Sequence, residues 1–384
     1  MRNRVLRTER HQGREQAETL WVGQRSASEN VVQAARRLGC LPEELLDFAS
    51  NLNPLGIAPA LRQLWRSTEA WRLLQLVQRY PDPEYTLLRQ AIAEAMGIAA
   101  EGVIPGNGTA EVLGWVAQEI AALEVEQVLT LAPHSYQLNQ ALQTVGRSPV
   151  YVPGLWASEE TVLAKVVAQT EGKSFAMLAS NPHNPTGQLY SRELWQQILA
   201  LPNCALLVVD ESLLDFCGTG IGLLAEVARH PNLVVVRSLT KFYAMPGLRL
   251  GFAAVGAEQG SRWEARRLPW NINVVAEQAA LACLQDWEYP AAVRVWLPPA
   301  RDRLYRGLQA IQGLTPYHSS AHFLLVRCDR RAQEWQEFLL YRHRILVKAG
   351  SSFAGLGDRH LRVGVRPLSE QDRLLAALAE AKLH

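Results

Sequence analysis

Residues 238–251 have the sequence SLTKFYAMPGLRLG and decide which fold the chain is expected to adopt. They place Lys241 and Arg249 close together, separated by a segment that contains Pro246 and Gly247. A lysine amine can bind an aldehyde covalently, and an arginine guanidinium is suited to a phosphate. This spacing therefore suits a cofactor that carries an aldehyde beside a phosphate.

Two upstream segments extend this pattern. Residues 181–187, NPHNPTG, contain Asn184, and residues 208–212, VVDES, contain Asp210. Asn184, Asp210, Lys241 and Arg249 follow one another along the chain in this order. The same order of residue types occurs in the fold type I aminotransferase superfamily, whose enzymes hold pyridoxal 5'-phosphate (PLP), and the chain resembles this superfamily. The resemblance implies an α/β fold, in which helices cover a mostly parallel, seven-stranded-type sheet and a smaller α+β domain follows at the C-terminus.

Length and composition agree with a two-domain globular enzyme. The chain has 384 residues, which exceeds the size at which one hydrophobic core keeps growing. Hydrophobic residues make up 48% and charged residues 20%, as in ordinary globular proteins. The formal net charge of +2 argues against a nucleic-acid partner. No window is apolar enough for a membrane span and no signal-peptide core follows the arginine-rich residues 1–15, so we expect a cytoplasmic protein.

The sequence does not predict metal or dinucleotide chemistry. Its five cysteines are scattered, with no C-x-x-C pair, and it contains no H-E-x-x-H motif. It also lacks the G-x-G-x-x-G pattern of dinucleotide-binding folds. Neither a zinc protease nor a Rossmann dehydrogenase is therefore supported, and no metal site is expected.

Short apolar runs bounded by turn residues predict the strands of the sheet. They occupy residues 128–132, 175–179, 205–209, 233–236 and 248–255, and further strands are expected over 322–326, 344–347 and 361–365. Helical spacing of apolar residues predicts helices over 30–38, 110–122 and 191–200. We expect an N-terminal arm over 1–57 that packs with the small domain, a large PLP-binding domain over 58–289 and a small domain over 290–384.

The resemblance gives three residues a direct role toward the cofactor. Lys241 is expected to form a Schiff base with the PLP aldehyde. Asp210, which follows an apolar run, is expected to keep the pyridine nitrogen protonated, so that the ring can accept electrons. Asn184 is expected to donate a hydrogen bond to the 3-oxygen. Each residue alone also fits a structural role, but their combination favours a cofactor site.

The cofactor phosphate needs several donors, which the sequence supplies in separate places. The backbone N–H groups of Gly108 and Thr109 lie at the start of a predicted helix, where an anion is stabilised. Ser238 and Arg249 add side-chain donors. Tyr80, in the segment RYPDP, matches the family tyrosine that reaches the phosphate of the partner subunit's cofactor. If it does so here, the protein is a homodimer.

Four further residues are candidates for contacts with the substrate or the cofactor ring. Arg362 matches the arginine that binds the substrate α-carboxylate in this superfamily, and a guanidinium does so bidentately. Arg366 is expected on the same strand face, where it binds a second anionic group or forms a structural salt bridge. Asn53 is expected to contact the substrate, and Tyr136 is the candidate for stacking on the cofactor ring.

Within the superfamily, the chain is most similar to the histidinol-phosphate aminotransferase branch, and there to the threonine-phosphate decarboxylases. This finer resemblance rests on residues 46–56, 79–85, 105–111 and 238–249. It implies PLP-dependent decarboxylation of L-threonine O-3-phosphate to (R)-1-amino-2-propanol O-2-phosphate in cobalamin biosynthesis. The alternative is a histidinol-phosphate aminotransferase that uses glutamate and 2-oxoglutarate.

The chain departs from these relatives at two positions. Leu213 stands where aminotransferases of the branch usually carry a tyrosine that binds the 3-oxygen, a change compatible with either reaction. Residues 27–30, ASEN, stand where the decarboxylases usually have HGGN near the substrate, which leaves the substrate open. A regulatory protein without turnover predicts a missing lysine or a DNA-binding extension, and the chain has Lys241 and no such extension.

Overall fold

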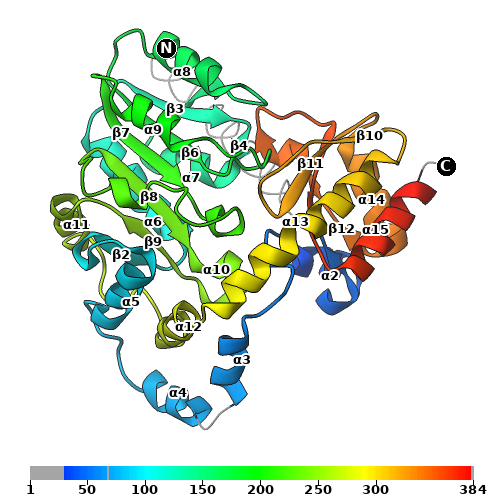
Figure 1. The fold of residues 1–384 in the computed structure, drawn as a ribbon, viewed down its shortest axis with the longest axis horizontal. Coiled ribbons are helices and arrows are strands. Elements are labelled where there is room, and N and C mark those ends of the chain that lie inside the picture. The colour runs from blue at the N-terminus through cyan, green and yellow to red at the C-terminus, as the bar shows by residue number, and fades with distance from the viewer. Residues whose placement is uncertain (1–29, 67–68, 382–384) are drawn as a thin grey trace, which may run out of the picture.

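The computed structural model describes residues 30–66 and 69–381. Its central element is a seven-stranded sheet with the order β2-β9-β8-β7-β6-β3-β5 (Figure 1). Strand β9 runs antiparallel to both of its neighbours, and the other adjacent pairs are parallel, so the expected α/β fold is confirmed. In chain order the strands are β2 (Val103–Gly106), β3 (Gln127–Ala132), β5 (Val150–Pro153), β6 (Phe175–Ser180), β7 (Cys204–Asp210), β8 (Leu233–Ser238) and β9 (Gly251–Ala254).

Helices cover both faces of this sheet. In β7, Leu207 and Val209 belong to one hydrophobic core, whereas Leu206 and Val208 belong to the other. Because both faces are buried, the strands are near-continuous apolar runs. The first core also takes side chains from α5 (Thr86–Met96), α8 (Glu159–Thr170), α9 (Arg192–Leu199) and α12 (Val274–Leu284), and the second from α6 (Thr109–Ala122), α7 (Tyr136–Gln143) and α11 (Ala257–Glu264).

A smaller α+β unit follows in the sequence. Its four-stranded antiparallel sheet has the order β10-β11-β15-β13. Its strands are β10 (Leu314–Pro316), β11 (Phe323–Cys328), β13 (Lys348–Ala349) and β15 (His360–Gly364), and its helices are α14 (Ala332–His343) and α15 (Leu368–Glu380). Helix α13 (Glu288–Gln309) includes the expected domain boundary at residue 290 and contacts both β10 and the large-domain turn η4 (Leu214–Phe216). A single helix therefore bridges the two units.

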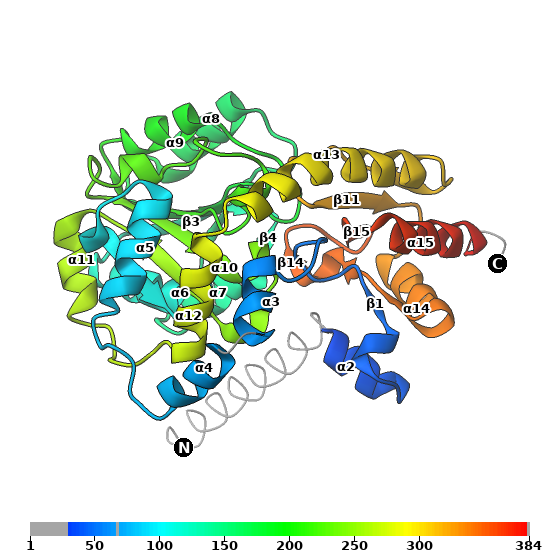
Figure 2. The same cartoon turned by 60° about the horizontal axis from the view of Figure 1, so that its bottom comes forward.

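The described part of the N-terminal arm, from residue 30 onward, lies with the small unit (Figure 2). Helix α2 (Val31–Leu38) packs against α14, because Ala34 and Ala35 share a hydrophobic cluster with Leu340. Asn30 caps this helix through a capping box with Gln33. The following strand β1 (Leu46–Asp47) pairs with β12 (Ile345–Leu346). Between the two units, β4 (His134–Ser135) pairs with β14 (Phe353–Ala354). After β1, the chain forms helices α3 (Pro59–Arg66) and α4 (Glu69–Val77), which extend away from the seven-stranded sheet (Figure 1).

The expected strand over 248–255 is shorter in the structure. Residues Pro246–Leu248 form a 3₁₀ turn, η6, and β9 begins only at Gly251. Arg249 lies between them with a φ of 61°, a left-handed conformation that is uncommon for a residue with a side chain. The backbone thus turns at Arg249 before it enters the sheet.

No helix in the two described ranges is long and apolar enough to cross a membrane. Over the same residues, no group of three or more His, Cys, Asp or Glu side chains is arranged to hold a metal ion.

Candidate active site

A cavity of about 370 Å³ lies where the arm, the large unit and the small unit meet. The large unit contributes residues from the chain after β3, β6 and β8, which is the edge where parallel α/β sheets bind their ligands. The cavity is lined by Ala49, Ser50, Asn51, Ser135, Tyr136, Gln137, Gln140, Asn184, Lys241, Lys348, Ser352 and Arg362. Four residues predicted from the sequence, Tyr136, Asn184, Lys241 and Arg362, are therefore brought together.

Lys241 lies in the short helix α10 (Leu239–Phe242), immediately after β8. Burial lowers the pKa of its amine, the carboxylate of Asp210 raises it, and the cations Arg362 and Arg249 lower it further. A lowered pKa increases the fraction of neutral amine, which is the form that attacks an aldehyde. The backbone carbonyl of Lys241 accepts a hydrogen bond from the backbone N–H of Asn53, 3.1 Å away. This bond ties α10 to the N-terminal arm.

Asp210 is the last residue of β7 and lies close enough to Lys241 to affect its pKa. Its carbonyl accepts from the backbone N–H of Asn181 at 2.9 Å, and its Oδ1 accepts from the N–H of Ser212 at 2.9 Å. These bonds hold the carboxylate at the carboxyl end of the sheet. A carboxylate in this place is suited to stabilise a protonated ring nitrogen.

Asn184 lies in the loop after β6, and its backbone N–H donates to Oγ of Ser180 at 3.0 Å. Its side-chain Oδ1 accepts a hydrogen bond from Nη1 of Arg362, 2.9 Å away. Arg362, in β15, is buried and also donates to the carbonyl of Ala49 in the arm. Burial lowers the pKa of Arg362 to about 9, although Asp47 raises it.

The four predicted phosphate ligands form a compact cradle. Gly108 caps α6 with a φ of 76°, and a Cβ added there would lie 2.3 Å from Nη2 of Arg249. Glycine at 108 therefore leaves room for the guanidinium. A Cβ at Gly251 would lie 2.9 Å from the backbone N of Thr109, so β9 also passes close to the start of α6. Ser238 ends the neighbouring strand β8.

Among the predicted residues that do not line the cavity, three are engaged elsewhere: Tyr80, Asn53 and Arg366. Tyr80 is 79% exposed and packs on Trp270, with ring centroids 4.7 Å apart. Asn53 is buried, and its amide is used by the backbone, since Nδ2 donates to the Phe242 carbonyl at 2.7 Å and Oδ1 accepts from the N–H of Leu55. Its neighbour Asn51 lines the cavity instead, and Oδ1 of Asn51 is buried without a hydrogen-bond partner.

Arg366 is the third residue outside the cavity. Because β15 ends at Gly364, the prediction that Arg366 shares a strand face with Arg362 is wrong. The chain turns at Pro367 into α15, and Nε of Arg366 donates to Glu370 at 2.9 Å. The salt bridge that the sequence left open is thus present. Binding of a second anion by Arg366 stays untested.

Lys348 is a cavity residue that the sequence analysis missed. It lies in β13 directly opposite Arg362 in β15. Burial, together with the nearby charges of Arg362 and Lys241, lowers the pKa of its amine to about 7. The only signal in the sequence is one lysine that interrupts the apolar run ILVKAG, residues 345–350.

Residues 43–378 match the family Aminotransferase class I and II, and the chain belongs to this family. It is 32% identical to the threonine-phosphate decarboxylase of Salmonella typhimurium over 358 residues, which cover 91% of this chain and 94% of that protein. It is 31% identical to histidinol-phosphate aminotransferase 2 of Pseudomonas aeruginosa, over 92% and 94% of the two chains. The crystal structure of the histidinol-phosphate aminotransferase from Clostridium acetobutylicum superimposes with a TM-score of 0.79 at 25% identity, over 88% and 99% of the chains.

The residues of the site fit PLP, the cofactor of this family. The amine of Lys241 and the amide of Asn184 line the cavity, and the carboxylate of Asp210 lies close enough to Lys241 to raise its pKa, so groups suited to the aldehyde, the 3-oxygen and the ring nitrogen are present. Beside them, Gly108 opens a space at a helix N-terminus that an anion can share with Arg249. The residues that would hold the group are Gly108, Thr109, Tyr136, Asn184, Asp210, Ser238, Lys241 and Arg249.

Proposed function

We propose that this protein is a PLP-dependent decarboxylase that converts L-threonine O-3-phosphate to (R)-1-amino-2-propanol O-2-phosphate, within cobalamin biosynthesis. The observation that carries the proposal is the pairing of Lys348 with Arg362 on adjacent strands of one cavity wall. Like charges directly opposite each other in a sheet are unfavourable without a counterion. An anionic ligand that contacts both residues would remove this cost.

The charge pattern of the cavity favours a substrate with two anionic groups. Among the described lining residues, Lys241, Lys348 and Arg362 are basic, and none is an aspartate or glutamate. Threonine phosphate carries a carboxylate and a phosphate on one molecule. Arg362 is suited to the planar carboxylate, and Lys348 to the phosphate as a compact point charge. Histidinol phosphate has a phosphate but no carboxylate, so of the two substrates of the aminotransferase reaction only glutamate would give Arg362 a carboxylate to bind.

Each residue then has a task that its surroundings support. Bound PLP supplies an electron sink for the pair of electrons that remains when a substrate bond breaks. Asp210 would hold the proton on the ring nitrogen, and Lys241 would hold the aldehyde and, once the substrate amine has displaced it, could carry protons near the substrate Cα. The bond to the carboxylate breaks, CO2 leaves and Cα gains a proton. Arg362 and Lys348 orient the substrate through its two anions and thereby select the bond that breaks.

A second candidate function is histidinol-phosphate aminotransferase, which the 31% identical relative from Pseudomonas aeruginosa supports.

One experiment distinguishes the two functions. Purified protein with PLP is incubated with threonine phosphate that is labelled in the carboxyl group. Parallel samples contain histidinol phosphate with 2-oxoglutarate, or glutamate alone. Release of labelled CO2 without formation of glutamate is expected. Glutamate formation from histidinol phosphate without CO2 release from threonine phosphate would overturn the proposal in favour of the aminotransferase.

We also infer that the active form is a homodimer in which Tyr80 reaches the partner's cofactor phosphate. Large exposed apolar side chains support a protein interface, since exposed apolar surface marks such sites. They include Trp71 and Leu74 of α4, Leu268, and Trp270, on which Tyr80 packs, and they are 48 to 73% exposed.

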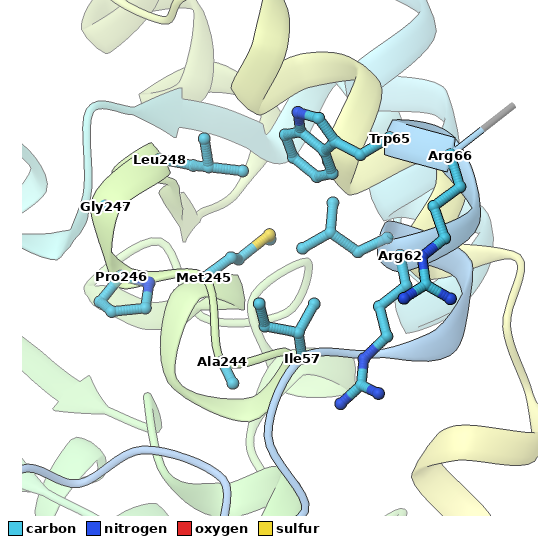
Figure 3. A pocket seen from close by; sticks show the side chains of 10 residues that line it. Ile57, Arg62, Trp65, Arg66, Ala244, Met245, Pro246, Gly247 and Leu248 are labelled. Atoms are coloured by element: carbon cyan, nitrogen blue, oxygen red, sulfur yellow. The ribbon is translucent and has the colours of Figure 1, made fainter. Parts of the chain in front are cut away.

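A second cavity is lined by residues of α3 and of the turn after Lys241 (Figure 3). It measures about 420 Å³ and lies between α3 and the turn η6, on the same segment that carries Lys241 and Arg249. Met245, Leu248 and Trp65 form its apolar part, while Arg62 and Arg66 extend from α3 along one side. A partner surface that covers α3 and η6 would therefore lie next to the phosphate cradle.

A further inference from the structure

A buried cluster of charged side chains lies directly behind the candidate active site. Glu211 follows Asp210, and Arg237 precedes Ser238 in the chain. Glu211 is fully buried and Arg237 is 8% exposed, but neither residue lines the cavity. Arg237 and Ser238 are successive residues of β8 and point to opposite faces of the sheet, whereas Glu211 directly follows Asp210, the last residue of β7.

Arg237 connects the ends of two neighbouring strands. Its Nη1 donates to the backbone carbonyl of Glu211 at 3.3 Å, and its Nε lies 3.9 Å from Oε2 of the same residue. The other carboxylate oxygen, Oε1, accepts from the backbone N–H of Leu223 at 2.7 Å. The pair therefore joins the end of β7, which carries Asp210, to the end of β8, which carries Ser238.

The cluster also reaches the helix that carries Lys241. Nη2 of Arg237 lies 3.5 Å from Oδ1 of Asp215, in the turn η4. The next residue, Phe216, packs against Phe242, with ring centroids 5.0 Å apart, and Phe242 directly follows Lys241. The guanidinium of Arg237, itself in β8, thus contacts Glu211 beside the ring carboxylate and Asp215 in η4, and it is linked to the helix of Lys241 through the Phe216–Phe242 contact.

This arrangement is unfavourable for stability alone. Oε2 of Glu211 and Nε of Arg237 are buried without a hydrogen-bond partner, and burial raises the pKa of the Glu211 carboxyl, although Arg237 lowers it. Gly222 provides the necessary space, because a Cβ there would lie 2.6 Å from Oε2. A buried ion pair is often no more stabilising than apolar residues of similar size, so its presence suggests a positional role.

We propose that Glu211 and Arg237 are positioning residues that set the distance between Asp210 and Ser238, and thereby the position in which PLP is bound. The inference rests on the proposed cofactor site and is independent of which substrate the enzyme uses. Removing Arg237 leaves Glu211 buried and unpaired, and removing Glu211 leaves Arg237 with Asp215 alone, so either single change lowers stability by itself. Two variants are therefore informative. The double substitution Glu211→Gln with Arg237→Met leaves no buried charge in the pair. Arg237→Lys keeps the positive charge but loses the planar guanidinium and its several donors.

The test measures PLP binding and folding separately. PLP is titrated into the apo form of each variant, and the dissociation constant is obtained from the cofactor absorbance. The circular dichroism of the cofactor band reports its orientation, and the melting temperature of the apo form reports stability. We expect the double variant and Arg237→Lys to bind PLP about ten-fold more weakly than the wild type, with an altered dichroic band. The melting temperature of the apo double variant should stay near that of the wild type.

Glu119→Gln is the matched control. Glu119 is also a buried carboxylate with arginine partners, since Arg266 lies 2.9 Å away, but it lies about 15 Å along α6 from Thr109. Its loss should lower the melting temperature without changing the PLP dissociation constant. Wild-type affinity and an unchanged dichroic band in both informative variants would overturn the inference, as would an equal loss of affinity in Glu119→Gln. Absence of PLP binding by the wild type would instead contradict the proposed function.

Discussion

The guanidinium of Arg362 donates a hydrogen bond to Oδ1 of Asn184 over 2.9 Å and so joins the small unit to the loop after β6. Because arginine can only donate, the oxygen of the Asn184 amide must face it. The amide NH2 group is then left to donate elsewhere, as a contact with the cofactor 3-oxygen requires. The residue assigned to the substrate carboxylate thus orients the residue assigned to the cofactor.

This contact gives a first prediction for Arg362→Lys. Lysine cannot bind Asn184, the Ala49 carbonyl and a carboxylate with the geometry of a guanidinium. Loss of charged hydrogen bonds worth about 1.5–3 kcal/mol corresponds to a fall in kcat/KM for threonine phosphate of about 10- to 100-fold. Steady-state kinetics measure the fall. Arg366→Lys is the control, because Arg366 pairs with Glu370 outside the cavity, and its kcat/KM should change less than about two-fold. Equal losses in the two variants would contradict the assignment.

The sequence predicted the central strands well because their environment is simple. Strands β7 and β8 are buried on both faces, so each is an uninterrupted apolar run that is visible without any knowledge of its neighbours. Strand β2 was missed, since its sequence VIPG contains a proline and a glycine, which favour turns. Strand β5 was missed because three of its four residues are exposed or only partly buried, so no apolar run marks it.

The candidate site was predicted only where local sequence determines it. Lys241, Asp210 and Asn184 each lie in a short segment whose residues already suggest a role. Lys348 was missed because its position beside Arg362 depends on the pairing of β13 with β15, and the sequence around Lys348 does not show which strand lies next to it. Arg366 was misplaced for a related reason: strand alternation was extended past Gly364, where the strand ends.

A second prediction concerns Lys241→Ala. The substitution removes the amine that binds the aldehyde, so the absorbance band of the lysine-bound cofactor should be lost and activity should fall to background. Absorbance spectra of the purified protein with added PLP test this directly. Lys173→Ala removes an exposed lysine and serves as the control. A band in Lys241→Ala that matches that of the wild type would show the lysine assignment to be wrong.

A third prediction follows from the pKa of Lys348, which is about 7. Below that pH the amine is protonated and attracts the substrate phosphate, whereas above it the free enzyme loses this charge. The KM for threonine phosphate should therefore rise as the pH increases from about 6.5 to 8.5. Lys348→Arg keeps its charge over this range and should show a flatter profile. Lys348→Met should have a KM about ten-fold higher than the wild type at pH 6.5.

The pH profile of Lys348→Arg separates this effect from titration of the substrate itself, which is common to all variants. If the wild type and Lys348→Arg show the same rise in KM with pH, Lys348 does not contact the phosphate.

The last prediction tests the homodimer through a site that two chains share. Tyr80 is 79% exposed and does not line the cavity of its own chain, so we expect it to complete the partner's phosphate cradle. Tyr80→Ala and Lys241→Ala should each be nearly inactive as pure proteins. When they are unfolded together and refolded as a mixture, each mixed dimer contains one site with an intact Lys241 and an intact partner Tyr80. At equal amounts, about half of the dimers are mixed, each with one of two sites restored, so about a quarter of the wild-type activity should return. A mixture of Lys241→Ala with Lys241→Arg is the control and should regain nothing. No gain in the first mixture, with mixed dimers verified by mass, would place Tyr80 outside the partner's site.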